Sequence, residues 1–171
     1  PPASVITDHP NVCFVGVDPR TAGTVQGEIV LNLDDHGDIN GDGVVKYVMI
    51  VGDPENVEAQ YRTEYSIKAL TDAGIPVECL VRDIAMWDQV TSNAIAAAAI
   101  AEYGDEIDVI FCNNDGMALG AYAAISAAGL TVGEDIYLVG IDATDECVYM
   151  VENGEMTGTV KNDYVTQSHT V

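Results

Sequence analysis

Short apolar runs rich in β-branched residues alternate along this sequence with longer stretches that carry apolar residues at helical spacing. This alternation is typical of a parallel sheet whose strands are joined by crossover helices. Strands are expected at 12–17, 47–51, 77–81, 109–112 and 137–141, with a weaker sixth at 158–160. Helices are expected at about 22–33, 56–73, 88–103, 116–128 and 145–152. The predicted fold is a three-layer α/β/α domain around a mostly parallel, doubly wound sheet.

The length of 171 residues suits one ordinary domain with a sizeable core, and it leaves no room for two of the usual size. Hydrophobic residues at 48% and charged residues at 20% are typical of a folded globular chain. The longest apolar run, 94–101, is too short for a membrane span. The chain begins at Pro1 without Met or an export signal, which we expect to reflect processing or truncation. One α/β domain is therefore expected over residues 1–171.

The charge balance is strongly acidic. Six Lys and Arg residues against 28 Asp and Glu residues give a formal net charge of −22. Such a surface repels the phosphates of nucleic acids and the headgroups of anionic lipids. Nucleic acid is therefore not expected as a partner.

The four cysteines, Cys13, Cys79, Cys112 and Cys147, lie far apart and form no C-x-x-C pair. The first three fall inside predicted strands, where cysteine commonly behaves as a small buried apolar residue. Buried free thiols are therefore favoured over disulfides, although the sequence leaves both alternatives open.

Polar side chains follow the end of each predicted strand after the first. In an open parallel sheet, ligands bind beyond the carboxyl ends of the strands, at a rim where loops and helix N-termini converge. The residues at this rim are Asn56, Glu58 and Arg62 after the second strand, Trp87 after the third, Asn114 and Asp115 after the fourth, Asp142 after the fifth, and Asn162 and Asp163 after the sixth. Carboxylate, amide and guanidinium groups bind hydroxyls, and an indole covers the apolar face of a pyranose. The set predicts a sugar site.

Each of these residues also has a purely structural explanation. Asp and Asn are common at helix N-caps, Arg62 can form a surface ion pair, and Trp87 can be a core aromatic residue. The sugar interpretation depends on the shared position of all of them at the ends of the strands.

The polar segment 34–43 lies between the first helix and the second strand and needs its own explanation. It contains Asp38, Asn40 and Asp42 at alternate positions and ends with Gly43, which Val44 follows. This pattern matches the first half of a D-x-[DN]-x-D-G calcium loop, so Ca²⁺ is the expected cofactor. The twelfth position is Met49 rather than Glu, so a carboxylate must come from elsewhere, and the ninth is Lys46, a poor companion for a divalent cation. The alternative is an ordinary Asp/Asn/Gly-rich turn.

Catalytic motifs are missing from the sequence. It contains no G-x-S-x-G elbow, no phosphate loop, no H-E-x-x-H, and no G-x-G-x-x-G after the first strand. His9 and His169 lie near the termini and His36 lies in the polar segment, where solvated roles are favoured. We therefore expect a binding protein and not an enzyme.

Several short segments carry a resemblance to a known family. They are Val15-Gly16-Val17-Asp18, Gln26-Gly27, Arg62-Thr63, Ala85-Met86-Trp87-Asp88, Asn113-Asn114-Asp115, Gly140-Ile141-Asp142-Ala143, and Gly158-Thr159-Val160 with Asn162-Asp163. With the loop at 38–44, they make nearly the whole chain resemble the glucose/galactose-binding proteins of bacterial sugar transport and chemotaxis, within the type I periplasmic-binding-protein superfamily. These motifs are specific in combination.

The resemblance implies two α/β lobes that are joined by hinge strands and close on a monosaccharide. This chain resembles only the C-terminal lobe, with the N-terminal lobe absent. The implied sugar ligands in this lobe are Arg62, Trp87, Asn114, Asp142 and Asn162. The implied calcium ligands are Asp38, Asn40, Asp42 and Val44, with a carboxylate from Asp108.

The family also implies partners and a location. These are an ABC permease, a chemoreceptor, and a place outside the cytoplasm, in the periplasm or on a cell-surface lipoprotein. Since closure uses both lobes, we expect an isolated lobe to bind sugar weakly and to be prone to self-association.

Three departures from the family pattern bear on the ligands. Asn56 and Glu58 stand where the family has His and Asp before the Arg, so the preferred sugar is expected to differ. Asp108 stands where Glu is usual, and Lys46 replaces an amide ligand of the metal.

Two other functions remain alternatives. One is the effector-binding core of a LacI-type transcriptional repressor, against which the acidic charge and the calcium-like segment argue. The other is an enzyme of doubly wound fold that acts on a sugar or nucleotide.

Overall fold

The structure, a computed structural model, describes residues 18–161. The expected strand at 12–17, together with Cys13, His9, Asn162, Asp163 and His169, lies outside the described residues.

All the other expected elements are present, and their bounds lie within a few residues of those expected. The strands are β1 (Val45–Val51), β2 (Val77–Ile84), β3 (Val109–Cys112), β4 (Tyr137–Ile141) and β5 (Gly158–Val160). The helices are α1 (Pro19–Leu31), α2 (Val57–Asp72), α3 (Gln89–Tyr103), α4 (Asp115–Ala127) and α5 (Asp145–Glu152), with a short 3₁₀ helix at Gly104–Glu106.

The first helix begins earlier than the periodicity suggests. Asp18 caps it by accepting a hydrogen bond from the backbone N–H of Arg20 at 3.0 Å, and Pro19 takes the first helical position. Proline is favoured there because its missing N–H has no partner in the first turn anyway. Strand β2 ends three residues later than expected, because its pairing with β1 continues to Val51 opposite Ile84.

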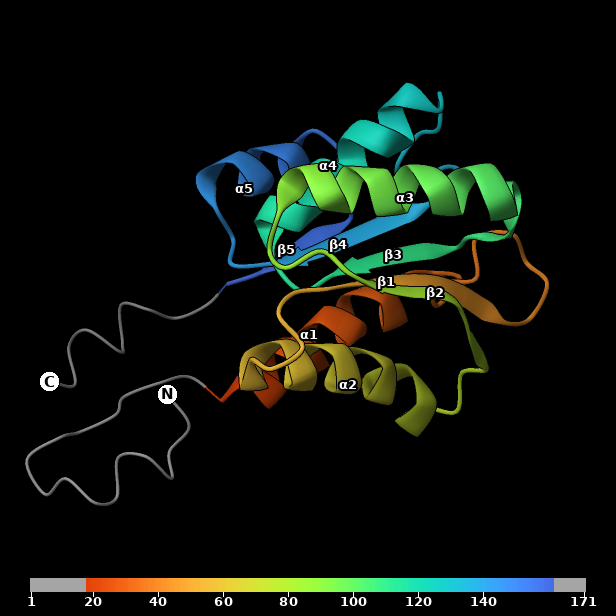
Figure 1. Cartoon of the computed structure of the whole chain (residues 1–171). Helices are drawn as coiled ribbons and strands as arrows, with labels where there is room; N and C mark the ends of the chain where they lie inside the picture. Colours follow the sequence, from red (N-terminus) through yellow and green to blue (C-terminus); the bar gives the residue numbers. More distant parts are fainter. Residues whose placement is uncertain (1–17, 162–171) are drawn as a thin grey trace, which may run out of the picture.

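The five strands form one parallel sheet in the order β2-β1-β3-β4-β5. Helices α1 and α2 cover one face, and α3, α4 and α5 cover the other, as Figure 1 shows. The three-layer, doubly wound architecture expected from the sequence is thus confirmed. The chain moves outward from β1 to β2 and then returns to place β3 on the other side of β1. The topological switch point therefore lies between the carboxyl ends of β1 and β3.

Both faces of the sheet are buried, so the central strands are apolar along most of their length, with Lys46 near the start of β1 as the charged exception. Val48, Ile50 and Ile110 point into the core shared with α3 and α4. Met49 and Phe111 point into the core shared with α1 and α2. This double burial fixes the strands and leaves the loops at their ends to carry polar chemistry.

Glycines bring the helices of each layer into backbone contact. A side chain at Gly27 in α1 would collide with the carbonyl of Ser66 in α2. A side chain at Gly120 in α4 would collide in the same way with the carbonyl of Gln89 in α3. The two helix pairs are therefore packed closely on opposite faces of the sheet.

Three cysteines lie in the described part of the chain, and all three are free thiols. Cys112 and Cys147 are buried as expected, and burial raises the pKa of the Cys112 thiol and raises that of Cys147 to about 11. Cys79 is exposed, so its expected burial is wrong. The reason is that β2 is an edge strand that is poorly covered along much of its length.

Between residues 18 and 161, no helix has the length and apolar character needed to cross a membrane.

Candidate functional site

Asn113, the residue that follows β3, ties the two sides of the switch point together. Its side-chain oxygen accepts a hydrogen bond from the backbone N–H of Gly52, just after β1, at 3.1 Å. Its side-chain nitrogen donates to the hydroxyl of Thr63 in α2 at 3.0 Å. Asn113 is fully buried, so these bonds fix the loops after β1 and β3 relative to α2.

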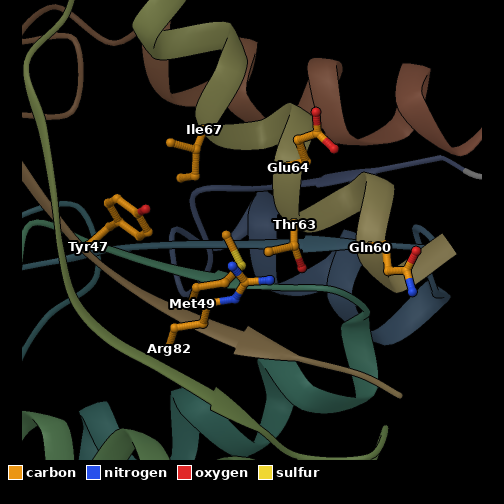
Figure 2. Close-up of a pocket in the computed structure, with 7 residues that line it drawn as sticks. All are labelled: Tyr47, Met49, Gln60, Thr63, Glu64, Ile67 and Arg82. Carbon is orange, nitrogen blue, oxygen red and sulfur yellow. The ribbon is translucent and has the colours of Figure 1, made fainter. Parts of the chain in front are cut away.

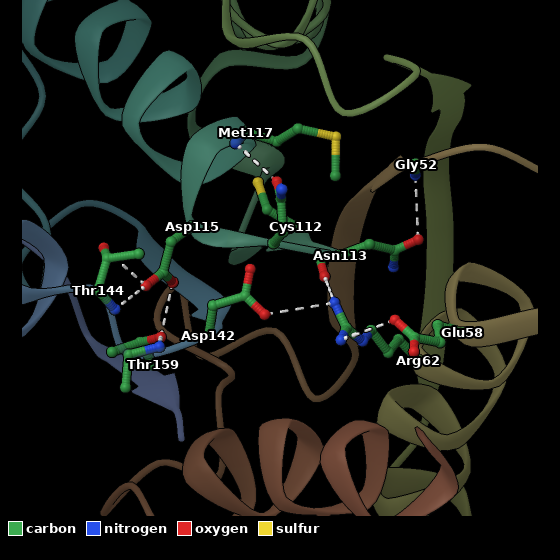
Figure 3. A network of polar contacts seen from close by, with 12 residues as sticks. Gly52, Glu58, Arg62, Cys112, Asn113, Asp115, Met117, Asp142, Thr144 and Thr159 are labelled. Atoms are coloured by element: carbon green, nitrogen blue, oxygen red, sulfur yellow. Dashed lines mark hydrogen bonds and ion pairs between the residues drawn. The ribbon is translucent and has the colours of Figure 1, made fainter. Parts of the chain in front are cut away.

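The guanidinium of Arg62 lies across the same point. Its Nη1 donates to the backbone carbonyl of Asn113 at 2.8 Å and lies 3.7 Å from Oδ1 of Asp142. Its Nη2 lies 3.3 Å from Oε2 of Glu58, one turn earlier in α2. Figure 3 shows the two carboxylates on either side of the guanidinium.

Arg62 is a buried charge at 4% exposure, whereas the side chain of Asp142 is 34% exposed and that of Glu58 is 56% exposed. A buried charge needs partners to offset its lost hydration, and the two carboxylates supply them. Its Nε is also buried and has no hydrogen-bond partner within residues 18–161. The carboxylates reach outward from a fixed cation, which is an arrangement suited to hydroxyl groups that both donate and accept hydrogen bonds.

A second buried carboxylate, Asp115, organises the other half of the rim. One of its oxygens accepts from the hydroxyl of Thr159 in β5 at 2.6 Å. The other accepts from the backbone N–H of Thr144 at 2.8 Å and from the hydroxyl of Thr144 at 3.0 Å. Asp115 is the first residue of α4, where the helix dipole also favours a negative charge. It joins the ends of β3 and β5 to the loop after β4 (Figure 3).

Strained backbone marks the ends of β2 and β4. Met86 and Trp87 have φ values of 52° and 66°, and Asp142 and Ala143 have values of 127° and 49°. Non-glycine residues rarely adopt these conformations, and such strain collects at ligand sites. The turn after β2 places the indole of Trp87 against Gly52, whose lack of a Cβ makes room for the ring. Trp87 is half-buried and packs against the cores on both faces of the sheet.

The N-cap explanation also holds for two of the expected ligands. Asn56 caps α2 by accepting from the N–H of Glu58 at 2.7 Å. Asn114 caps α4 by accepting from the N–H of Met117 at 2.9 Å. Each cap uses the amide oxygen, so the amide nitrogen keeps its N–H donors at the rim.

The structure thus brings most of the expected sugar residues to one edge. Arg62, Glu58 and Asp142 form one cluster, Trp87 lies over Gly52, and Asn56 and Asn114 begin the adjacent helices. Asn162 lies outside the described residues. The sequence interpretation placed Asp115 at the rim without giving it a role, and it missed Thr63, Thr144 and Thr159. Only long-range contacts reveal these threonines, whereas the role of Asn113 could have been found from its place directly after a buried strand.

A cavity of about 420 Å³ lies elsewhere, between α2 and the exposed edge of the sheet (Figure 2). It is lined by Tyr47, Met49, Gln60, Thr63, Glu64, Ile67 and Arg82. None of the expected sugar residues lines it, although Thr63 connects its wall to Asn113.

The acidic loop, residues 38–44, folds on itself at the opposite end of the sheet. The carboxylate of Asp38 accepts from the backbone N–H groups of Gly41, Asp42 and Gly43 at 2.9, 3.1 and 2.9 Å. Asp108, which precedes β3, accepts from the N–H of Asn40 at 3.2 Å. The loop and Asp108 therefore come together, as the family resemblance implies.

Lys46 lies in β1, two residues after this loop ends. Its backbone and its side chain both contact the acidic groups. Its N–H donates to Asp108 at 2.7 Å, and its Nζ lies 2.6 Å from Oδ2 of Asp42 and 3.8 Å from Oε2 of Glu106. The bond to Lys46 lowers the pKa of the Asp42 carboxyl, and the bond to Asp42 raises the pKa of the Lys46 amine. Burial raises the pKa of Asp108, and the charges of Asp38 and Asp42 raise it further.

The residues present do not fit a calcium ion well. Within residues 18–161, no group of three or more His, Cys, Asp or Glu side chains is arranged to hold a metal ion. The oxygens of Asp38 already accept hydrogen bonds from backbone N–H groups, and the ammonium of Lys46 forms an ion pair with Asp42. Calcium binding itself stays a prediction.

The fold and the rim together define a doubly wound α/β domain with a cluster of polar side chains at the switch point, the usual place for a ligand in such a sheet. Comparison with known families matches residues 3–170 to the periplasmic binding protein domain. The chain belongs to this family.

Relatives and solved structures agree with that assignment. The D-galactose/methyl-galactoside binding periplasmic protein MglB of Haemophilus influenzae is 35% identical over 175 residues, covering 100% of this chain and 52% of that protein. The putative rhizopine-binding protein of Rhizobium meliloti is 32% identical, with 97% of this chain and 51% of that protein covered. A Bacillus halodurans ABC transporter solute binding protein with bound myo-inositol has a TM-score of 0.78 at 27% identity, covering 92% of this chain and 51% of that chain. The chain therefore spans about half the length of the curated relatives it matches.

Proposed function

We propose that this chain is one lobe of the solute-binding component of an ABC sugar transporter, which binds a monosaccharide between two lobes outside the cytoplasm. Its activity is binding without turnover. The partners are the membrane permease and, as a further proposal, a chemoreceptor.

The observation that carries this proposal is the cluster of Arg62, Asp142 and Glu58 at the switch point. A sugar hydroxyl can donate to a carboxylate while it accepts from a guanidinium, so paired groups of both kinds recognise neighbouring hydroxyls. The half-buried Trp87 supplies an apolar surface for the carbon face of the ring. The buried bonds of Asn113 and Asp115 hold these groups in place before a ligand arrives, which lowers the cost of binding.

Apolar exposure at the rim supports a second surface that covers it. Val57, Ile84 and Met86 are 42%, 45% and 57% exposed, and each lies at the carboxyl end of the sheet or directly after it. Closure of a second lobe over this edge would bury them and would favour the liganded state through contacts that the open state lacks. The same exposure supports self-association of a lobe on its own.

The proposed ligand is a neutral monosaccharide of the glucose/galactose kind or a related cyclic polyol. The H. influenzae relative is named for binding D-galactose and methyl-galactoside, and the B. halodurans structure holds myo-inositol. Asn56 and Glu58 at the start of α2 are the positions that we expect to set the preference, since Glu58 contacts Arg62 directly.

Calorimetric titration of a two-lobe protein that contains this chain, with a panel of hexoses, pentoses and inositol, tests the proposal. We expect one sugar to bind and Arg62→Met to weaken its affinity about 100-fold, because a charged hydrogen-bonding group is lost from the site. Lys68→Met on the same helix is the matched control, because Lys68 pairs with Asp72 on the surface.

Two results would contradict the proposal. One is unchanged affinity in Arg62→Met with a folded protein, and the other is conversion of the bound sugar to a product on prolonged incubation, followed by mass spectrometry.

A further inference from the structure

The acidic loop and its neighbours gather several negative charges in a small volume. Asp38 and Asp42 lie in the loop, Asp108 is fully buried beneath it, and Glu106 lies beside it. Like charges at such short range repel one another unless a positive charge lies among them. Loops with this spacing of Asp and Asn obtain that charge from a divalent ion.

Lys46 is placed to supply the charge instead. Its Nζ forms a 2.6 Å ion pair with Asp42 and lies 3.8 Å from Glu106, and its side chain is only 18% exposed. Its backbone N–H holds Asp108 at 2.7 Å. One residue at the second position of β1 therefore connects the loop, the buried carboxylate and the 3₁₀ helix that precedes it.

The remaining oxygens of the loop are already engaged. Both oxygens of Asp38 accept backbone N–H groups, and Oδ1 of Asp42 accepts from the N–H of Val44 at 3.0 Å. The side-chain oxygen of Asn40 accepts from the N–H of Asp42 at 3.0 Å. The loop is thus closed by its own amides, and among residues 18–161 its cation contact is the one with Lys46.

We infer that the ammonium of Lys46 is the built-in cation of the acidic loop, so that the loop is held closed without a metal ion. The ammonium belongs to a residue of β1, so no ion has to bind from solution. The closed conformation of the loop therefore does not depend on the calcium concentration. The inference further implies that the chain is one substitution away from a metal site. Lys46→Gln removes the ammonium and offers an amide oxygen where this spacing places a ligand. The inference is independent of the proposed sugar function, because the acidic loop lies at the opposite end of the sheet.

Thermal unfolding of the full chain in EDTA, in about 5 mM CaCl₂ and in about 5 mM MgCl₂ tests the inference. We expect the Tm of the unaltered chain to differ by less than about 1 °C among the three solutions. Lys46→Gln should melt lower in EDTA and should regain about 3–6 °C with Ca²⁺, as a site of roughly half-millimolar affinity would give. Lys68→Gln is the matched control, because Lys68 also pairs with an aspartate four residues away but far from the loop.

Two further variants separate the charge from the packing of the side chain. Lys46→Arg keeps the charge and should retain most of the stability in EDTA, whereas Lys46→Met should be destabilised without any response to Ca²⁺. A terbium luminescence titration gives an independent reading of metal binding for each variant, including one that unfolds at room temperature in EDTA.

Three results would overturn the inference. They are a clear rise in the Tm of the unaltered chain with Ca²⁺, a Lys46→Gln variant as stable in EDTA as the unaltered chain, or a destabilised Lys46→Gln variant that neither binds terbium nor recovers with Ca²⁺.

Discussion

Strand β3 has acidic residues near both of its ends, and the two ends use them differently. At the amino end, Asp108 holds the acidic loop through backbone N–H groups, and Lys46 balances the charge within the loop. At the carboxyl end, Asn113 and Asp115 hold the surrounding loops through buried bonds. Beside them, the cation Arg62 has half-exposed carboxylates as its neighbours.

The comparison distinguishes buried side chains that fix the loops from side chains that are exposed to solvent. Both ends contain buried groups whose hydrogen bonds are satisfied by the chain itself. At the carboxyl end, however, Asp142 and Glu58 extend from the supported region toward solvent, and the strained backbone after β2 and β4 aims side chains at the same edge. The same residue types thus close one end of the strand and leave exposed carboxylates at the other end, where we propose that the sugar binds.

The largest effect that would sharpen this comparison is expected at Asp115. Asp115→Ala removes the acceptors of three hydrogen bonds and leaves buried donors on Thr144 and Thr159 unpaired. We expect the free energy of unfolding to fall by about 3 kcal/mol in urea denaturation followed by circular dichroism. The control is Asp105→Ala, an exposed aspartate near the amino end of β3, with a change of about 0.5 kcal/mol or less. Equal effects at the two sites would remove the supporting role that we assign to Asp115.

A smaller effect is expected at the amino end, where the hydroxyl of Tyr137 donates to Asp35 at 2.7 Å. Burial, followed by this bond to Asp35, raises the pKa of Tyr137 to about 12. A phenol with a raised pKa in the folded state adds stability below its unfolded pKa of about 10 and loses it as pH rises through the folded value. Tyr137→Phe should therefore cost about 1 kcal/mol near neutral pH, and the difference from the unaltered chain should disappear between about pH 10 and pH 12. Urea titrations at a series of pH values measure the free energy of unfolding of both proteins. An advantage of the unaltered chain that grows with alkaline pH would contradict the assignment.

The smallest effect concerns thiol reactivity rather than stability. Cys112 is the last residue of β3 and is buried directly before Asn113, whereas Cys79 is exposed in β2. Of the three cysteines between residues 18 and 161, iodoacetamide should modify Cys79 first and leave Cys112 and Cys147 protected in the folded chain, as measured by peptide mass spectrometry. Rapid modification of Cys112 would show that the carboxyl end of β3 opens readily, and it would break the contrast between a rigid support and an exposed binding edge.

The sequence predicted the sheet well because the central strands are mostly apolar runs, a pattern that burial on both faces demands. It predicted the position of Arg62 and Asp142 at the rim because parallel strands end at one edge. It did not predict the burial of Asn113 or the bonds of Asp115 to Thr144 and Thr159, since those partners are distant in the chain. The exposure of Cys79 was missed for a related reason, because a strand's place at the edge of a sheet is set by topology and not by its own residues.

Gly27 and Gly120 have a consequence for how such a domain can change over evolutionary time. Because backbone meets backbone at both points, neither helix pair can slide without a collision, and the scaffold tolerates little drift there. Trp87 and Asp142 lie on short loops at the rim, and the side chains of Glu58 and Arg62 reach the rim from the first two turns of α2. New ligand preferences can therefore arise by replacing a few exposed side chains, while the frame that presents them is inherited unchanged.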